Sequence, residues 1–144
     1  MAHDLPYSHT VPYFKTSRAA SDSWIGKTKD LLKRIGATDL KEGFLAGDDF
    51  ATFALSFRVG ADSFRVAWPV LPVKDPRDEP AARVQAATLV YHECKARCLA
   101  ATILGPRPAF VSYLLLSGGK TVMESTSQAI ETAVRSAGFL EHKK

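Results

Sequence analysis

The fold is decided by one stretch of the sequence, which reads Phe53-Ala-Leu-Ser-Phe-Arg-Val59, then Gly60-Ala61, then Asp62-Ser-Phe-Arg-Val-Ala-Trp68. Large apolar residues alternate with small or polar ones along both halves, as they do in strands that bury one face. Glycine followed by one further residue suits a two-residue hairpin loop. We therefore predict an antiparallel hairpin with strands at 53–59 and 62–68.

The register of this hairpin decides which side chains share a face. With a two-residue loop, Phe57 lies opposite Phe64. Successive side chains of a strand point to opposite faces, so Arg58 and Arg65 lie together on the other face. The sequence leaves open whether the aromatic face, which ends at Trp68, is buried in the core or lines a cleft.

Helices are predicted before and after the hairpin. Apolar residues recur at helical spacing between Trp24 and Ile35, and Gly36 stops the pattern in a position that favours a left-handed residue. Pro80 suits the first turn of a long helix over residues 80–104. The buried seam of that helix is expected to consist of Val84, Ala87, Tyr91, Cys94, Cys98 and Ala101.

The remaining segments complete an α+β fold with flanking N- and C-terminal helices. A strand near 40–46 gives an antiparallel sheet of three to four strands, packed against the long helix. Residues 1–20 show neither helical nor strand periodicity and are predicted to form an extended arm. Residues 21–144 are then predicted to form the single domain. The apolar run 108–116 is either a helix or a strand, because short runs are ambiguous by period alone. A last helix is expected after Ser117-Gly118-Gly119, with Val122, Ile130, Ala133, Val134 and Ala137 packed inward.

The composition is that of one globular domain. The chain has 144 residues, 46% hydrophobic and 24% charged, with a mean hydropathy of -0.07, and this length suits a single core. No apolar run reaches the ~20 residues that cross a bilayer, and the first residues lack the basic and apolar regions of a secretory signal. We therefore expect a cytoplasmic protein with no membrane partner. The net charge of +4 and the pI ≈ 9.2 lean towards an anionic partner.

Motifs that would carry catalysis or bind a cofactor are incomplete. Gly119-Lys120-Thr121 resembles the end of a phosphate-binding loop, but Leu114 stands where that loop requires its earlier glycine. His92 and Cys94 project about 160° apart on a helix, so they do not share a metal ion. Cys94 and Cys98 lie four residues apart in the predicted helix and are poorly disposed to form a disulfide, so they are expected to be reduced thiols. The sequence predicts a non-enzymatic protein, with no catalytic residue, metal site or cofactor assigned.

Basic residues interleaved with aromatics provide the leading functional prediction. Single-strand binders use cationic grooves to follow phosphates and aromatic faces to stack bases. We therefore predict a sequence-tolerant, non-catalytic binder of single-stranded DNA or RNA. The alternative is a protein-interaction factor, an inhibitor or adaptor that docks on a host or phage protein through an apolar patch. The residues expected to contact nucleic acid are Arg58, Arg65, Trp68, Lys74, Arg77 and Lys95.

Five short motifs resemble those of an uncharacterised family of small phage, prophage and plasmid proteins. They are a Thr-Ser helix start, a leucine-glycine helix end, a hairpin that finishes in proline, a Lys-Ala-x-x-x-Ala helix and a Gly-x-Thr-Val turn. The long helix departs from the family in having cysteines where leucines are usual. The resemblance implies a protein of a mobile element. The motifs stand here as Thr16-Ser17, Leu32 to Gly36, Phe64-Arg65-Val66 with Pro69, Lys95-Ala96-Arg97-Cys98-Leu99-Ala100, and Gly119-Lys120-Thr121-Val122.

The order of helix, antiparallel sheet and further helices is also similar to that of the single-stranded DNA-binding proteins that replace OB-fold proteins in some thermophilic archaea. Those proteins bind DNA in a cleft between the sheet and the helices, lined with aromatic and basic groups. The similarity is one of element order. It implies that Lys95, Arg58, Arg65 and Trp68 line one cleft.

Overall fold

Three antiparallel strands form one sheet in the order β1-β2-β3. They are β1 (Thr38–Leu45), β2 (Thr52–Val59) and β3 (Asp62–Pro69). The computed structural model describes residues 5–16, 20–47 and 50–126 of the chain. The sheet and its helices confirm the predicted α+β class.

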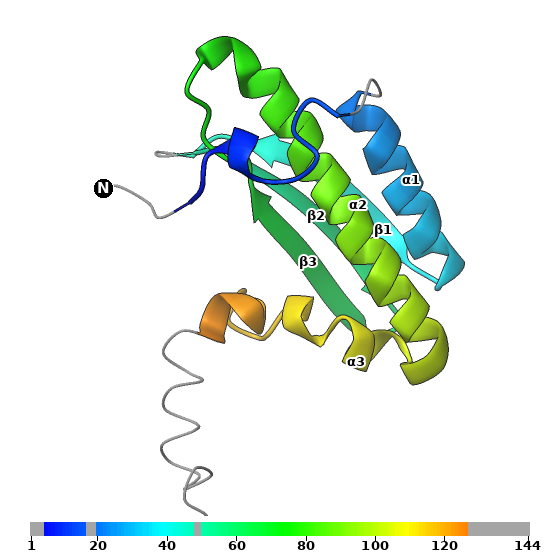
Figure 1. Cartoon of the computed structure of the whole chain (residues 1–144). Helices are drawn as coiled ribbons and strands as arrows, with labels where there is room; N and C mark the ends of the chain where they lie inside the picture. The colour runs from blue at the N-terminus through cyan, green and yellow to red at the C-terminus, as the bar shows by residue number, and fades with distance from the viewer. Residues whose placement is uncertain (1–4, 17–19, 48–49, 127–144) are drawn as a thin grey trace, which may run out of the picture.

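Two long helices cover one face of the sheet. Figure 1 shows α1 (Ser21–Arg34) and α2 (Glu79–Leu104) side by side in front of the strands. Gly36 follows α1 with a φ of 94°, which confirms the left-handed position predicted at the helix end. The shorter elements are α3 (Pro106–Ala109) and 3-10 turns at Ser8–Thr10, Pro76–Asp78, Val111–Tyr113 and Met123–Ser125.

The hairpin has the predicted register. Phe57 lies opposite Phe64 and Phe53 lies opposite Trp68, while Gly60 takes a φ of 61° in the loop. The three phenylalanines are buried, because their face of the sheet is the one that the helices cover. Trp68, at the end of β3, is partly buried against the same core. The aromatic face of the hairpin is therefore the core face.

The buried surface of α2 is wider than the predicted seam. Within that seam Val84 and Tyr91 are only partly buried. The helix contacts the sheet, α1 and the N-terminal arm, so it is enclosed on more than one side. A single stripe of residues cannot describe such a helix. Further buried residues of α2 are Ala82, Gln85, Ala86, Thr88 and Val90.

The apolar run at 108–116 forms neither a continuous helix nor a continuous strand. It begins within α3, continues through a 3-10 turn, and ends where Leu114 bridges Phe64 and Leu115 bridges Thr121. Pro106 and Pro108 fix the first turn, after which Phe110 enters the core against the rings of the hairpin. Most of the predicted last helix lies outside the described residues.

The N-terminal arm is held against α2 by one buried side chain. Gln85 Nε2 donates hydrogen bonds to the carbonyl oxygens of Ser8, Val11 and Pro12, each at 3.0 Å. Its Oε1 accepts a hydrogen bond from the Ser8 hydroxyl at 2.5 Å. Residues 5–16 therefore pass over the first half of α2, as Figure 1 shows.

Candidate binding groove

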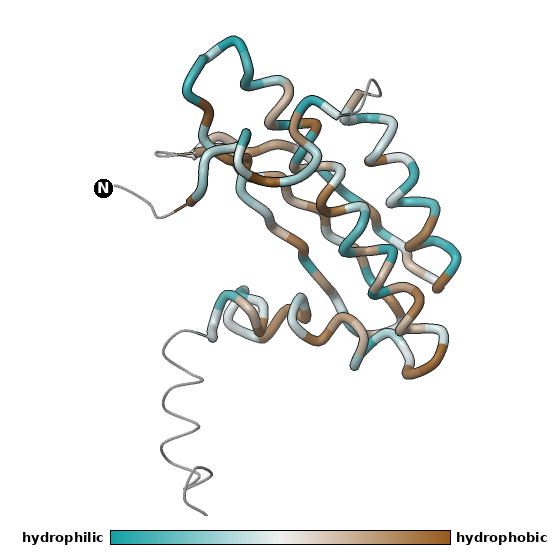
Figure 2. Tube along the Cα trace, in the orientation of Figure 1, coloured by the Kyte–Doolittle hydropathy of each residue, from teal (hydrophilic) through white to brown (hydrophobic). Residues whose placement is uncertain are grey.

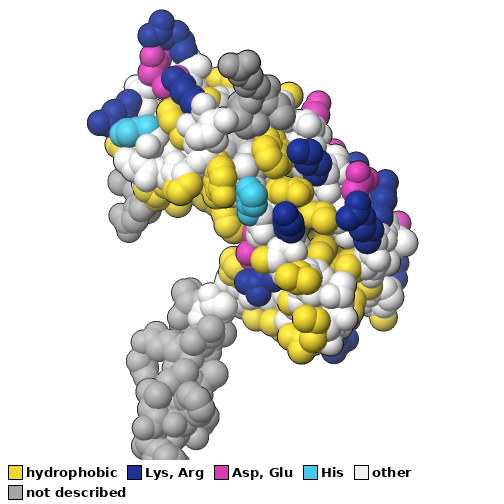
Figure 3. Space-filling model, turned by 45° about the vertical axis from the view of Figure 1, so that its right-hand side comes forward, with side chains coloured by type: hydrophobic (Ala, Val, Ile, Leu, Met, Phe, Trp, Pro, Cys, Tyr) yellow, Lys and Arg dark blue, Asp and Glu magenta, His cyan; other side chains and the backbone are white. Residues whose placement is uncertain are grey.

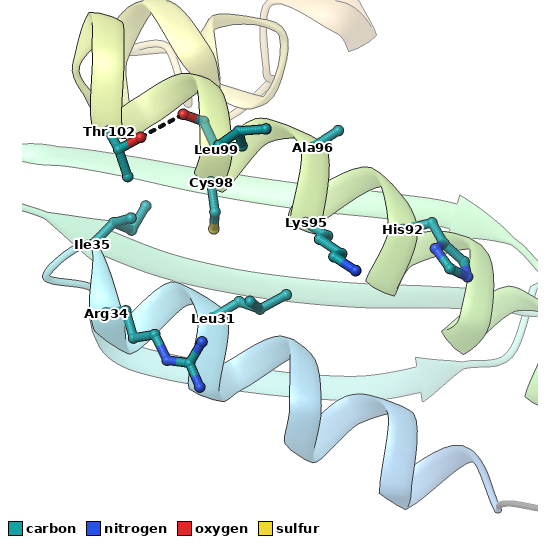
Figure 4. A pocket seen from close by; sticks show the side chains of 9 residues that line it. All are labelled: Leu31, Arg34, Ile35, His92, Lys95, Ala96, Cys98, Leu99 and Thr102. Atoms are coloured by element: carbon teal, nitrogen blue, oxygen red, sulfur yellow. Dashed lines mark hydrogen bonds between the residues drawn. The ribbon is translucent and has the colours of Figure 1, made fainter.

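A groove of about 530 Å³ lies between α1 and α2 on the side away from the sheet. Its floor is apolar because Leu31 and Ile35 lie one turn apart at the end of α1, and α2 presents the buried Cys98 opposite them. Figure 4 shows Leu31 and Ile35 on one side of this space and Cys98 on the other, with Ala96 at the outer edge of α2. The lining residues are Leu31, Arg34, Ile35, His92, Lys95, Ala96, Cys98, Leu99 and Thr102.

Apolar side chains continue from the groove to the end of α2. Leu99 is 67% exposed, Ile103 77% and Leu104 63%, so three large apolar side chains lie in water on the last turns of one helix. Figure 2 shows this end of α2 as hydrophobic although it is at the surface. Exposed apolar side chains gathered in this way mark interaction surfaces.

The charged residues at the groove are cations. Arg34 and Lys95 line it, and no Asp or Glu is among the residues that do so. Within the described part of the chain, neither of these two cations forms an ion pair. Figure 3 shows basic side chains, with acidic ones among them, around the apolar ones on this side of the molecule. The groove therefore has an apolar floor and a positive rim.

Aromatic rings occupy the N-terminal side of the groove. The ring of Tyr13 stacks on His92 with centroids 4.8 Å apart, and Trp24 lies 5.2 Å from Tyr91. Lys27 Nζ lies 4.6 Å from the centroid of Trp24. These rings are engaged with one another and with a lysine, so the arm and α1 close this end of the groove.

The structure does not bring the six residues predicted to bind nucleic acid to one surface. Lys95 lines the groove. Lys74 and Arg77 lie in the loop before α2, where Lys74 sits over the ring of Tyr7 and Arg77 pairs with Asp75 at 2.8 Å. The hydrogen bonds from Arg77 lower the pKa of the Asp75 carboxyl.

Arg58 and Arg65 lie together on the outer face of the sheet, as predicted. Each has a carboxylate nearby: Arg58 is 3.7 Å from Asp39, and Arg65 is 2.5 Å from Glu124. Burial alone would raise the pKa of Glu124, but hydrogen bonds from Arg65 and from the Thr121 backbone outweigh it and lower that pKa. Both arginines are therefore partly neutralised within the chain.

Trp68 is held in place from the core side. Its Nε1 donates to the Tyr113 hydroxyl at 3.4 Å, and that hydroxyl donates to Glu93 Oε2 at 2.5 Å. Burial, together with this bond to Glu93, raises the pKa of Tyr113. Glu93 Oε2 also accepts a hydrogen bond from Arg97 Nε at 3.2 Å. Trp68 lines a separate apolar hollow of about 350 Å³ rather than the groove.

Sequence reasoning missed most of the groove. Leu31 and Ile35 belong to the apolar set that recurs at helical spacing in the sequence, but both are only partly buried and also line the groove. The signal that was available is the apolar set Leu99, Ile103 and Leu104, which falls outside the predicted seam of α2. Large apolar residues off the seam of an amphipathic helix indicate a second contact surface.

The two cysteines of the described chain are buried thiols. Cys94 and Cys98 are free and buried, and burial raises the pKa of Cys98 to about 11 and that of Cys94 further. No three His, Cys, Asp or Glu side chains in the described ranges gather where they would hold a metal ion.

Comparison of the chain with protein-family models, curated proteins and solved structures finds no match. Among the helices of residues 5–16, 20–47 and 50–126, none combines the length and apolar character that crossing a bilayer requires.

Proposed function

We propose that this chain is a non-catalytic binding protein that holds a segment of another protein in the α1–α2 groove. The observation that supports this is the combination of an apolar floor, exposed Leu99 and Ile103 beside it, and a rim with Arg34 and Lys95. Compact apolar patches bordered by polar groups are typical of protein docking sites. A groove for single-stranded nucleic acid would instead present open aromatic faces for the bases, and His92 is the one ring among the lining residues.

The groove can be probed with 1-anilinonaphthalene-8-sulfonate, whose fused rings and sulfonate match an apolar floor and a cationic rim. We expect saturable binding to the full chain by fluorescence titration. Ala96→Glu places a carboxylate in the groove and is expected to weaken binding about tenfold, which equals ~1.4 kcal/mol. Ala46→Glu makes the same change at an exposed position outside the groove and is expected to leave binding unchanged. Equal binding by the two variants would contradict the proposal.

Single-stranded nucleic-acid binding stays a second proposal, and a different surface favours it. On the outer face of the sheet, Arg58 and Arg65 are joined by Lys41, which has no ion pair among the described residues. Ser56 and Ser63 lie between these cations and line a hollow of about 420 Å³ with Lys41, Arg58 and Asp39. A cationic face with small side chains allows a phosphate backbone to approach closely.

This second proposal has a quantitative test by fluorescence anisotropy of a labelled single-stranded oligonucleotide. If Lys41, Arg58 and Arg65 each contact a phosphate, log affinity is expected to fall against log salt with a slope of about −2, at ~0.7 per contact. Lys41→Ala is expected to flatten that slope by ~0.7, whereas Lys33→Ala on α1 is expected to leave it unchanged. Absence of binding at low salt would remove this candidate.

A further inference from the structure

We infer that the occupant of the α1–α2 groove is an amphipathic α-helix of another protein, apolar towards the groove and acidic along its flanks. This inference rests on the proposed function and adds the conformation and the charge of the partner. Three features support it: the shape of the groove, the chemistry of its walls and the distribution of its charges.

The groove has the shape that receives a helix. Its walls are two helices that lie side by side, and a third helix packs into such a depression by placing its side-chain ridge between theirs. On α2 the lining runs from His92 to Thr102, which at 1.5 Å per residue is about 15 Å, or roughly three helical turns. The exposed Leu99 and Ile103 extend the apolar contact towards the end of α2.

The walls favour a helix over an extended segment. The groove is lined by side chains of two helices, whose backbone groups are bonded within the helices. An extended peptide would bring its own N–H and C=O groups onto an apolar floor without partners, at a cost for each buried group. A helix satisfies these groups internally and presents only side chains.

The charges select an acidic partner and disfavour a second copy of this chain. Arg34 and Lys95 lie on opposite walls, and neither forms an ion pair among the described residues. A two-fold pairing of one groove on another would bring the Arg34 and Lys95 of both copies together. Glutamate or aspartate side chains on both flanks of a helix would instead meet a cation on each wall.

The inference is tested with three stapled helical peptides of about 15 residues, whose anisotropy is measured with the full chain. The first has leucines along one stripe and glutamates on both flanks; the second has lysines in place of the glutamates; the third has serines in place of the leucines. We expect the glutamate peptide to bind, the lysine peptide to bind about tenfold more weakly, and the serine peptide not to bind. Ala96→Glu is expected to abolish binding of the first peptide, and Ala46→Glu to leave it unchanged.

Reversal of the charge on the wall provides a readout that a folding defect would not produce. Lys95→Glu is expected to invert the preference, so that the lysine peptide binds more tightly than the glutamate peptide. If Lys95→Glu still bound the glutamate peptide more tightly than the lysine peptide, the inference would be overturned. The same holds if a single-stranded oligonucleotide competes with the glutamate peptide for the groove. If the naphthalene probe binds in the groove but the peptides bind equally, the acidic helix is wrong and the proposed function stands. If neither the naphthalene probe nor any peptide binds, the inference and the proposed function are both wrong.

Discussion

Phe64→Ala is expected to lower the free energy of unfolding by about 3–5 kcal/mol, a large fraction of the stability of a domain this size. The ring is fully buried and lies 5.2 Å from the ring of Phe57 and 5.9 Å from that of Phe110. Its removal leaves a cavity where the hairpin, α3 and the segment after it meet. The measurement is a guanidinium titration that follows tryptophan fluorescence and circular dichroism.

Arg65→Ala is the matched control, because it truncates the next residue on the opposite face of β3. Its ion pair with Glu124 is about one-third exposed, so its loss is expected to change stability by about 0–1 kcal/mol. If the two substitutions had similar effects, the assignment of the aromatic face to the core would be wrong.

Gln85→Leu is the second substitution with a large expected effect. The side chain is fully buried, and it satisfies three carbonyl oxygens of the N-terminal arm. Leucine fills a similar volume but donates no hydrogen bond, so the arm must leave α2 or keep unsatisfied acceptors, at about 1–3 kcal/mol. We expect a lower midpoint in guanidinium, together with faster amide exchange in residues 5–16.

Local opening distinguishes this effect from a general loss of stability. In Gln85→Leu, exchange in the arm should accelerate more than exchange in β2 or β3. Thr10→Ala removes an exposed hydrogen bond to the Tyr7 carbonyl and is expected to leave both exchange and stability nearly unchanged. Uniform acceleration over the whole chain would show that Gln85 does not act through the arm.

The hairpin could be predicted because its information is local. Strict alternation from Phe53 to Trp68, with a glycine at the turn, allows one register that keeps every large ring on one face. The end of α1 could be predicted as well, since Gly36 follows apolar residues that recur at helical spacing. Strand β1 was placed within two residues, before the turn residues that begin at Gly47.

The groove and the ion pairs of the basic residues could not be predicted, because both depend on residues far apart in the chain. Arg65 meets Glu124 across 59 positions, and no pattern near either residue indicates this contact. The polar Gln85 within a buried helix gave no local sign of the arm that it holds. The short turns after Pro106 are set by the prolines and by the burial of Phe110. The spacing of apolar residues in this segment therefore does not predict them.

The two helices that form the groove, α1 and α2, are separated along the chain by residues 35–78, which include the whole sheet. The unfolded chain has no such surface, so any occupant binds the native state alone and shifts the folding equilibrium by mass action. At a hundredfold excess over its dissociation constant, a ligand of this kind adds ~2.7 kcal/mol to the stability. Helical peptides can therefore be ranked by melting temperature alone, without a label on either molecule.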